Sequence, residues 1–414
     1  MHVLGHLSVE EFLRDYWQKK PVLIRNAWPG FEPLLAADEL AGLSLEQEIE
    51  SRLIIEDGIP GEPDSGPWQL KRGPFTEEDF RTLPDDKWTL LIQGVDQWIP
   101  EAADLLEHFR FIPSWRIDDL MISYAVDGGN VGPHYDQYDV FLLQAEGQRE
   151  WSIGQMCNEH TPFLKGPQIR VLEDFNEADS WVLNPGDMLY LPPQLAHHGI
   201  ARGECMTYSI GFRAPSAVEL AQATLDEMLV SASDDQRYQD PDLQPTTTPT
   251  GNTPGKIDAA AAQRLRNTLT QILADDASCQ RILGKLMTEA KYPEHQPEVL
   301  EPISWADLQQ HLSHSGQHLS HSGQLRKSEF ARFAYSHSND DNNRHSENDS
   351  SSKLCEMFYQ GQSAILPESD LSLIEYLCNH GHYEPQKLLS LVHSDSAQQL
   401  LTTLWRQQLI YTEE

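Results

Sequence analysis

Residues 132–141 read Gly132-Pro133-His134-Tyr135-Asp136-Gln137-Tyr138-Asp139-Val140-Phe141, which places a histidine and an aspartate two positions apart. Residues i and i+2 of an extended chain point the same way, so the imidazole of His134 and the carboxylate of Asp136 can reach one ion. The apolar run 140–143 follows at once and predicts a buried strand. The segment therefore predicts two metal ligands at the entrance to a β-strand.

A third candidate ligand lies sixty-one residues after Asp136, in the segment Leu191-Pro192-Pro193-Gln194-Leu195-Ala196-His197-His198-Gly199. Two histidines and one carboxylate on one face of a metal form the facial triad of non-haem Fe(II) oxygenases, which leaves positions open for other ligands. We expect His197 to complete the triad. The adjacent His198 is the alternative.

The spacing alone is weak evidence, because His393-Ser394-Asp395 repeats it. That copy precedes a predicted helix, for which Asp395 is the expected N-cap. A buried ion pair in a β-turn is the competing explanation for His134 and Asp136. Their context favours the metal site, because a strand follows them and a Pro-Gly-Asp turn precedes the segment that carries His197.

An oxygenase that uses an oxo-dicarboxylate also needs a cation for the far carboxylate of that molecule. Arg149, on the strand after the first motif, has a planar fork that suits a carboxylate. An exposed strand arginine is the alternative. Thr207, on the strand after His197, is a candidate to add a hydroxyl, although threonine is common in half-buried strands.

The fold class follows from many short apolar or alternating runs before residue 215, separated by Gly, Pro, Asn and Asp. This pattern is typical of a sandwich or barrel rather than of alternating βαβ units. A helix, 9–17, begins with a capping box at Ser8 and Glu11. The predicted strands are 21–24, 120–124, 140–143, 150–153, 181–183, 188–191 and 206–212, with a further helix at 101–108.

The remainder of the chain predicts helices and a small α+β module. Three regions result. We expect 1–215 to form a β domain and 216–295 to be helical, with a linker at 231–256. The third region, 296–414, is similar to winged helices and contains a low-complexity insertion at 311–353, which opens with a tandem repeat of His-Leu-Ser-His-Ser-Gly-Gln. The predicted elements are helices at 216–230, 258–275, 277–291, 371–378, 385–392 and 397–408, and strands at 357–366 and 409–411.

Composition limits the possible partners and location. The chain has 30 Lys and Arg against 64 Asp and Glu, a formal net charge of −34. Such a surface repels nucleic acid and anionic lipid and attracts a basic partner. Five scattered cysteines without a CxxC pair indicate reduced thiols rather than a disulfide framework or a zinc site. With neither a secretory leader nor a membrane span, we expect a cytoplasmic protein.

Several stretches together resemble the cupin-like JmjC oxygenases, and most closely the bacterial ribosomal oxygenases that hydroxylate an arginine. They are 19–27, 134–144, 147–151, 191–193 with His197, and 208–213. The resemblance implies a double-stranded β-helix (jelly-roll or cupin) JmjC domain over 1–215, then a helical dimerisation region and a C-terminal winged helix. Two departures from the family are the low-complexity insertion and the second histidine after the third ligand.

The resemblance also implies the chemistry of the site. His134, Asp136 and His197 match the Fe(II) ligands, Arg149 and Thr207 match the partners of the 2-oxoglutarate carboxylate, and O₂ is the other cosubstrate. The implied substrate is an arginine of the large-subunit ribosomal protein conventionally numbered sixteen, and the implied assembly is a homodimer. A basic polypeptide substrate agrees with the net charge of −34.

Other functions remain to be compared with this hypothesis. A 2-oxoglutarate oxygenase with this site could act on another protein residue or on a small molecule. A non-enzymatic alternative is a winged-helix regulator, which the excess of acidic residues in 301–414 argues against. Another is a scaffold with a vestigial cupin, which the complete set of candidate ligands argues against.

Overall fold

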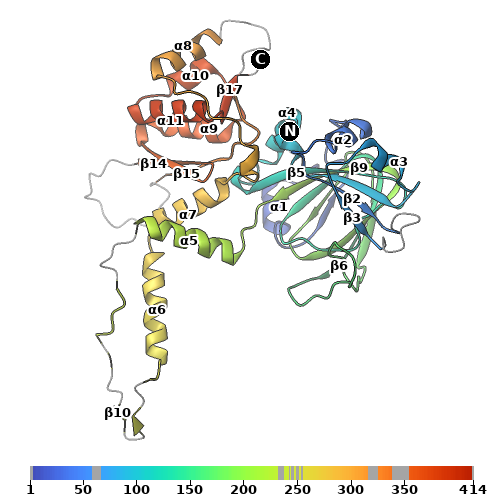
Figure 1. Cartoon of the computed structure of the whole chain (residues 1–414), viewed down its shortest axis with the longest axis horizontal. Coiled ribbons are helices and arrows are strands. Elements are labelled where there is room, and N and C mark those ends of the chain that lie inside the picture. The colour runs from blue at the N-terminus through green and yellow to red at the C-terminus, as the bar shows by residue number, and fades with distance from the viewer. Residues whose placement is uncertain are drawn as a thin grey trace. The chain divides into compact units, whose positions relative to one another are not determined.

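The structure is a computed structural model of the 414-residue chain, and it describes residues 3–57, 67–231, 237–241, 243, 247–248, 251–252, 255–315, 325–337 and 354–412. They form two compact units (Figure 1). The first comprises 1–214 with the short segments 294–296 and 328–330, and the second comprises 215–293, 297–327 and 331–414. In the described part of the chain, no helix is long and apolar enough to cross a membrane.

One antiparallel sheet dominates the first unit, in the order β1-β8-β6-β9-β5-β4-β2-β3 with β7 paired to β6. Its long strands, β6 and β9, pair with each other over most of their length. This arrangement, with helices around the sheet, confirms the predicted cupin-type fold. The strands are β1 (Val22–Ile24), β2 (Ser51–Ile55), β3 (Gln69–Arg72), β4 (Trp88–Ile92), β5 (Ile117–Ala125), β6 (Val140–Met156), β7 (Asp179–Leu183), β8 (Met188–Leu191) and β9 (Leu195–Phe212).

The prediction of separate strands at 140–143 and 150–153 is wrong, because both are parts of β6. The pairing of β6 with β9 continues across register shifts between them. Gly147 lies in this irregular stretch with φ 61°, and a Cβ there would lie 2.1 Å from the carbonyl oxygen of Glu204. Glycine therefore lets β6 bulge without leaving the sheet.

Helices cover the first unit and complete its core. The predicted capping box at Ser8 and Glu11 starts α1 (Val9–Asp15), which ends two residues before its predicted end. Phe12 of α1 is fully buried between the rings of Phe141 and Tyr190. The other short helices are α2 (Ala37–Leu43), α3 (Glu77–Arg81), α4 (Pro100–Leu106) and the 3₁₀ turns η1 (Val95–Gln97), η2 (Glu107–Phe109) and η3 (Ser114–Arg116).

The second unit contains the helical region and the C-terminal α+β region. It confirms the predicted helices and the predicted C-terminal combination of helices and strands. Its sheets have the orders β13-β14-β15 and β16-β12-β17. Its helices are α5 (Ala217–Ser231), α6 (Ala259–Ile272), α7 (Asp276–Thr288), α8 (Trp305–Ser315), α9 (Leu371–Asn379), α10 (Pro385–Ser390) and α11 (Asp395–Arg406), with turns η4 (Pro293–His295, mostly in the first unit) and η5 (Glu368–Asp370). Its strands are β10 (Thr247–Thr248), β11 (Gly251–Asn252), β12 (Leu325–Lys327), β13 (Phe333–His337), β14 (Leu354–Tyr359), β15 (Gln362–Pro367), β16 (His382–Tyr383) and β17 (Ile410–Thr412).

Helix α7 links the helical region to the C-terminal sheet. The Arg281 Nε donates to Glu356 Oε1 of β14 at 2.8 Å, and Lys285 Nζ donates to Glu227 Oε2 of α5 at 2.8 Å. Gly284 faces the ring of Phe358 so closely that a Cβ would overlap it. The missing side chain allows this helix to pack directly on the strand.

Two predictions for this region need correction. The strand predicted at 357–366 is the hairpin β14–β15, which turns at Gln360 and Gly361, both with positive φ, as a tight two-residue turn requires. The N-cap of α11 is Ser394 and not Asp395, because the Ser394 side chain accepts the hydrogen bond from the N–H of Ala397.

The predicted extent of the insertion, 311–353, is also wrong. Residues 311–315 complete α8, and 325–337 contain β12 and β13. Leu312 of α8 and Leu325 of β12 are fully buried in the core of the second unit. Leu312 follows the buried Leu308 by one helical turn, so both side chains lie on the buried face of α8. The stretches 316–324 and 338–353 of the prediction, and half of the predicted linker 231–256, lie outside the described residues.

We therefore expect Leu312→Ala to destabilise the protein by about 2–5 kcal/mol, the range for truncating a buried leucine. Leu354→Ala is the matched control, because Leu354 is 46% exposed and its truncation leaves no cavity. Urea unfolding of both variants measures the difference. Equal stability of the two would mean that the repeat does not contribute to the core.

Candidate metal centre

The backbone brings His134 and His197 together. The N–H of His134 donates to the carbonyl of His197 at 3.0 Å, and the N–H of His197 donates back at 2.8 Å. The two residues thus form an isolated antiparallel bridge, and directly opposed residues point their side chains to the same face. A third hydrogen bond, from the N–H of Gln194 to the carbonyl of Asp136 at 2.7 Å, holds the two segments together beyond the bridge.

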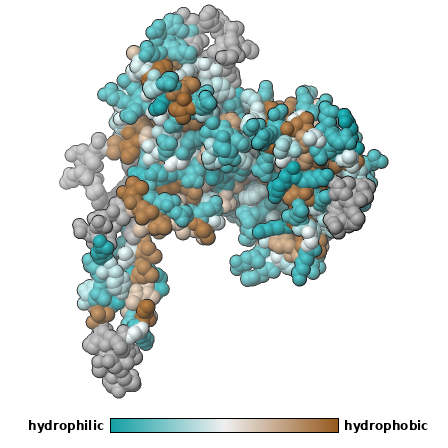
Figure 2. All heavy atoms as spheres, viewed as in Figure 1, coloured by the Kyte–Doolittle hydropathy of each residue, from teal (hydrophilic) through white to brown (hydrophobic). Residues whose placement is uncertain are grey.

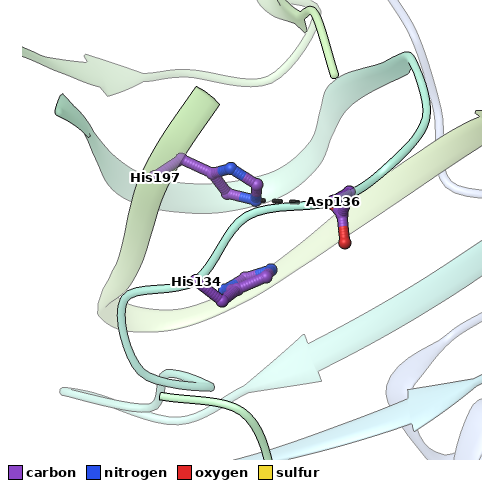
Figure 3. A group of neighbouring side chains, drawn as sticks. All are labelled: His134, Asp136 and His197. Carbon is purple, nitrogen blue, oxygen red and sulfur yellow. Dashed lines mark ion pairs between the residues drawn. The ribbon is translucent and has the colours of Figure 1, made fainter. Parts of the chain in front are cut away.

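The side chains of His134, Asp136 and His197 converge (Figure 3). One ligand atom from each lies within 4.8 Å of the others, a spacing at which the group could hold a metal ion. The Nε2 of His197 lies 3.6 Å from Asp136 Oδ2. The structure therefore brings together the three residues that the spacing predicted.

Both histidines are oriented by the same kind of hydrogen bond. The Nδ1 of His134 lies 3.0 Å from the carbonyl oxygen of Gly132, and the Nδ1 of His197 lies 2.9 Å from that of Leu195. A carbonyl accepts only, so each Nδ1 carries the proton and each Nε2 keeps its lone pair for a metal. Burial, and then the neighbouring His134, lowers the pKa of His197 to about 4. The ring therefore stays neutral, as ligation requires.

His198 takes a different place. Its Nε2 lies 3.3 Å from the Oδ1 of Asn130, and its ring lies against Phe175. Successive strand residues face opposite sides, which is why His197 joins the triad and His198 does not.

Asn130, which the sequence motifs did not single out, lies in the segment before His134. Its side chain is buried, and its Oδ1 accepts from the indole N–H of Trp68 at 2.9 Å and the backbone N–H of Gly132 at 2.8 Å. Its Nδ2 donates to Glu56 Oε2 at 2.6 Å. Asn130 thus ties the segment before His134 to His198 and to two residues that flank strands, Glu56 after β2 and Trp68 before β3. Only the three-dimensional contacts reveal this role, because a turn asparagine is common.

Arg149 lies on β6 opposite Ala201 of β9, and its side chain is only 4% exposed. Its Nε and Nη2 atoms are buried and have no hydrogen-bond partner among the described residues. Its guanidinium carbon lies 5.7 Å from the centre of the Trp151 ring. Buried guanidinium N–H groups without an acceptor are costly, so the open Nε and Nη2 donors fit an anionic group that enters the barrel. The alternative of an exposed strand arginine is wrong.

Thr207 is buried on β9 opposite Gln144 of β6. Its hydroxyl lies 3.1 Å from the Oε1 of Gln144, to which it donates. In β9 and β6, Thr207 and Gln144 lie on the face that carries the inner apolar cluster of Leu142 and Trp151. The structure thus places Thr207 on the inner face, but its hydroxyl proton is engaged by Gln144 and not directed to an open acceptor site.

Together these residues can bind a divalent cation and an anion in one barrel. Two imidazole nitrogens and one carboxylate oxygen suit Fe(II) and leave coordination positions for further ligands. The guanidinium of Arg149 supplies a charge-assisted site for a carboxylate. The buried, unpartnered nitrogens of Arg149 are the feature of this structure that a bound dicarboxylate would explain.

Comparison with known proteins agrees with this geometry. The family model for the JmjC domain matches residues 104–220. The chain is 35% identical, over 70% of its length and 76% of the relative's, to the ribosomal protein uL16 3-hydroxylase of Escherichia coli. It is 40% identical to a probable ribosomal oxygenase of Haemophilus influenzae, over 58% of this chain and 55% of the relative.

Solved structures of ribosomal oxygenases match this chain over a larger share of its length than the sequence relatives do. The structure of YcfD, a ribosomal oxygenase from E. coli, covers 100% of both chains with a TM-score of 0.79 and 27% identity. A second YcfD structure, in complex with cobalt and 2-oxoglutarate, has a TM-score of 0.77 at 27% identity and covers 99% of both chains.

Fold and site thus define a JmjC-type oxygenase that depends on 2-oxoglutarate and uses Fe(II) and O₂. The predicted enzyme class and cofactors are confirmed. Within that class, the chain belongs to the family of bacterial ribosomal oxygenases.

Proposed function

We propose that this oxygenase hydroxylates an arginine side chain of a large-subunit ribosomal protein, uL16. The observation that carries the proposal is the 35% identity with a relative named for uL16 hydroxylation, over 70% of this chain and 76% of that relative. The net charge of −34 supports a basic polypeptide as the substrate, since opposite charge steers such a partner to the enzyme. The predicted cytoplasmic location, where ribosomes are made, is part of the same proposal.

The inner face of the barrel supports a cationic side chain as the target. Asp119 and Ser209 lie on the face that carries Thr207, because Asp119 pairs with Gly211 and the spacing from Thr207 is even. The carboxylate of Asp119 is held by the side-chain amide of Gln93 at 2.6 Å and the N–H of Gly94 at 3.1 Å. A negative charge fixed in this way suits a guanidinium, which pairs strongly with carboxylates.

We assign roles to the predicted site residues on the same basis. His134, Asp136 and His197 are the proposed Fe(II) ligands, and Arg149 and Thr207 are the proposed partners of the 2-oxoglutarate carboxylate. The iron and its cosubstrates supply the oxidising chemistry when bound. The chain orients both imidazoles through backbone carbonyls, offers Arg149 to the cosubstrate, and excludes water with the apolar inner cluster that includes Leu142 and Trp151.

We further propose that 1–215 is the catalytic domain, that 216–295 pairs two subunits, and that 296–414 is an accessory module. Apolar stripes on the second region support the pairing: Val218, Leu225 and Leu229 on α5, and Leu265 and Leu269 on α6 with Leu273 at its C-cap, are exposed at helical spacing. Figure 2 shows hydrophobic residues along α6. Exposed apolar patches of this kind mark protein–protein contacts.

The substrate assignment is tested with the purified protein, Fe(II), 2-oxoglutarate and uL16. We expect uL16 to gain the mass of one oxygen atom, which fragment spectra place on an arginine. Omission of 2-oxoglutarate, and the Arg149→Ala variant, should each prevent the gain. Oxidation of another residue type would refute the arginine assignment, and no oxidation of any ribosomal protein in a total extract would refute the substrate class.

The ligand assignment predicts opposite results for two adjacent histidines. His197→Ala should weaken Co(II) binding by more than about a hundredfold, since loss of a group that only hydrogen-bonds to a metal ligand already costs about 10–100-fold. His198→Ala should retain most of the affinity, because its ring lies outside the triad. Calorimetric titration measures both. The reverse pattern would show that the third ligand is wrong by one residue.

The pairing role predicts a particle of twice 47.0 kDa in light scattering at micromolar concentration. Leu225→Glu with Leu229→Glu should give monomers, because it places charge on the apolar stripe of α5. Met156→Glu is the control, since Met156 is 60% exposed on β6, far along the chain from α5. A wild-type mass near 47.0 kDa would contradict the dimer.

A further inference from the structure

Among the described residues, two side chains on the inner face of β6 have buried nitrogen atoms without an acceptor. One is Arg149, whose Nε and Nη2 were described above. The other is Trp151, which is 5% exposed and whose indole Nε1 has no hydrogen-bond partner within the part of the chain that the structure describes. Buried indole N–H groups usually find a partner, so the open donor of Trp151 calls for an explanation.

The register of the sheet places Trp151 between the metal centre and Arg149. On β6, the residues Arg149, Trp151 and Ile153 alternate onto one face, and they pair with Ala201, Gly199 and His197 of β9. Ile153 is therefore opposite a triad residue, and Arg149 is two residue pairs further along. A molecule that reaches from the triad to Arg149 must pass Trp151.

The ring of Trp151 is held in place by Gly199. A Cβ at position 199 would lie 2.7 Å from the Cη2 and Cζ3 atoms of the indole, so the ring lies directly on the glycine backbone. The guanidinium of Arg149 lies 5.7 Å from the ring centre on the same face of β6. Packing thus fixes the indole before any ligand binds, and its N–H needs no rearrangement to donate.

We propose that the indole N–H of Trp151 donates a hydrogen bond to the distal carboxylate of 2-oxoglutarate, alongside Arg149. This inference rests on the proposed role of Arg149. A carboxylate has two oxygens and accepts several hydrogen bonds, so it can satisfy the guanidinium and the indole together. Trp151 is then a cosubstrate-binding residue as well as part of the apolar inner cluster.

The test is the affinity of the Co(II)-loaded full-length protein for 2-oxoglutarate, measured by calorimetric titration. Trp151→Phe keeps an aromatic ring and removes the N–H. We expect it to bind 2-oxoglutarate about tenfold more weakly, which corresponds to about 1.4 kcal/mol, with Co(II) affinity unchanged. Trp181→Phe is the matched control, because Trp181 lies directly opposite Trp151 on β7, is partly exposed, and packs on the same cluster.

Unchanged 2-oxoglutarate affinity in Trp151→Phe, or an equal loss in Trp181→Phe, would overturn the proposal. Arg149→Ala separates it from the proposed function: if that variant binds 2-oxoglutarate as tightly as the wild type, the role of Arg149 itself fails. If Trp151→Phe does not fold, the Zn(II)-loaded wild-type protein decides. Its Trp151 indole N–H resonance, recognised by the ring's contact with Gly199, should move downfield with 2-oxoglutarate, and an unmoved resonance would overturn the proposal.

Discussion

The two backbone hydrogen bonds between His134 and His197 set the geometry on which the site depends. They join a segment that enters β6 to the start of β9, and they fix both imidazoles on one face before any metal binds. The carbonyls of Gly132 and Leu195 then fix which nitrogen of each ring is free. A metal in this barrel therefore meets ligands that the sheet has already oriented, so little ordering entropy is lost when it binds.

The same pair of strands extends this order away from the triad. Beyond His197, β9 runs beside β6 so that the positions of Ile153, Trp151 and Arg149 follow one another at two-residue intervals. Glycines at 147 and 199 serve opposite purposes there. Gly147 takes up an extra residue in a bulge, whereas Gly199 leaves room for an aromatic ring. The register of one sheet therefore determines both where a cation would lie and how far from that cation the carboxylate of a ligand would bind.

The sequence predicted the parts of this arrangement that depend on local spacing. The pattern His-x-Asp before an apolar run, with a distant histidine, placed the triad, because alternation along a strand is a local property of the chain. The bulged continuity of β6 and the hub at Asn130 could not be predicted, since both depend on which strand lies opposite. The predicted insertion was too wide for a related reason: the repeat is mostly polar, yet its leucine Leu312 completes a buried helical face. Low complexity describes composition, and burial depends on partners.

Charge explains why a protein with a net charge of −34 can still receive a dicarboxylate. Most of that charge is on exposed side chains, where solvent and salt screen it beyond about a Debye length. Among the groups proposed to bind the ion and the cosubstrate, the formal charges balance: a divalent ion and Arg149 carry three positive charges, and Asp136 with a dicarboxylate carries three negative ones. A buried site that becomes neutral only when both ligands are present avoids the cost of an uncompensated interior charge. The outer surface can then remain acidic, while the cosubstrate is selected by the few desolvated groups that it meets inside.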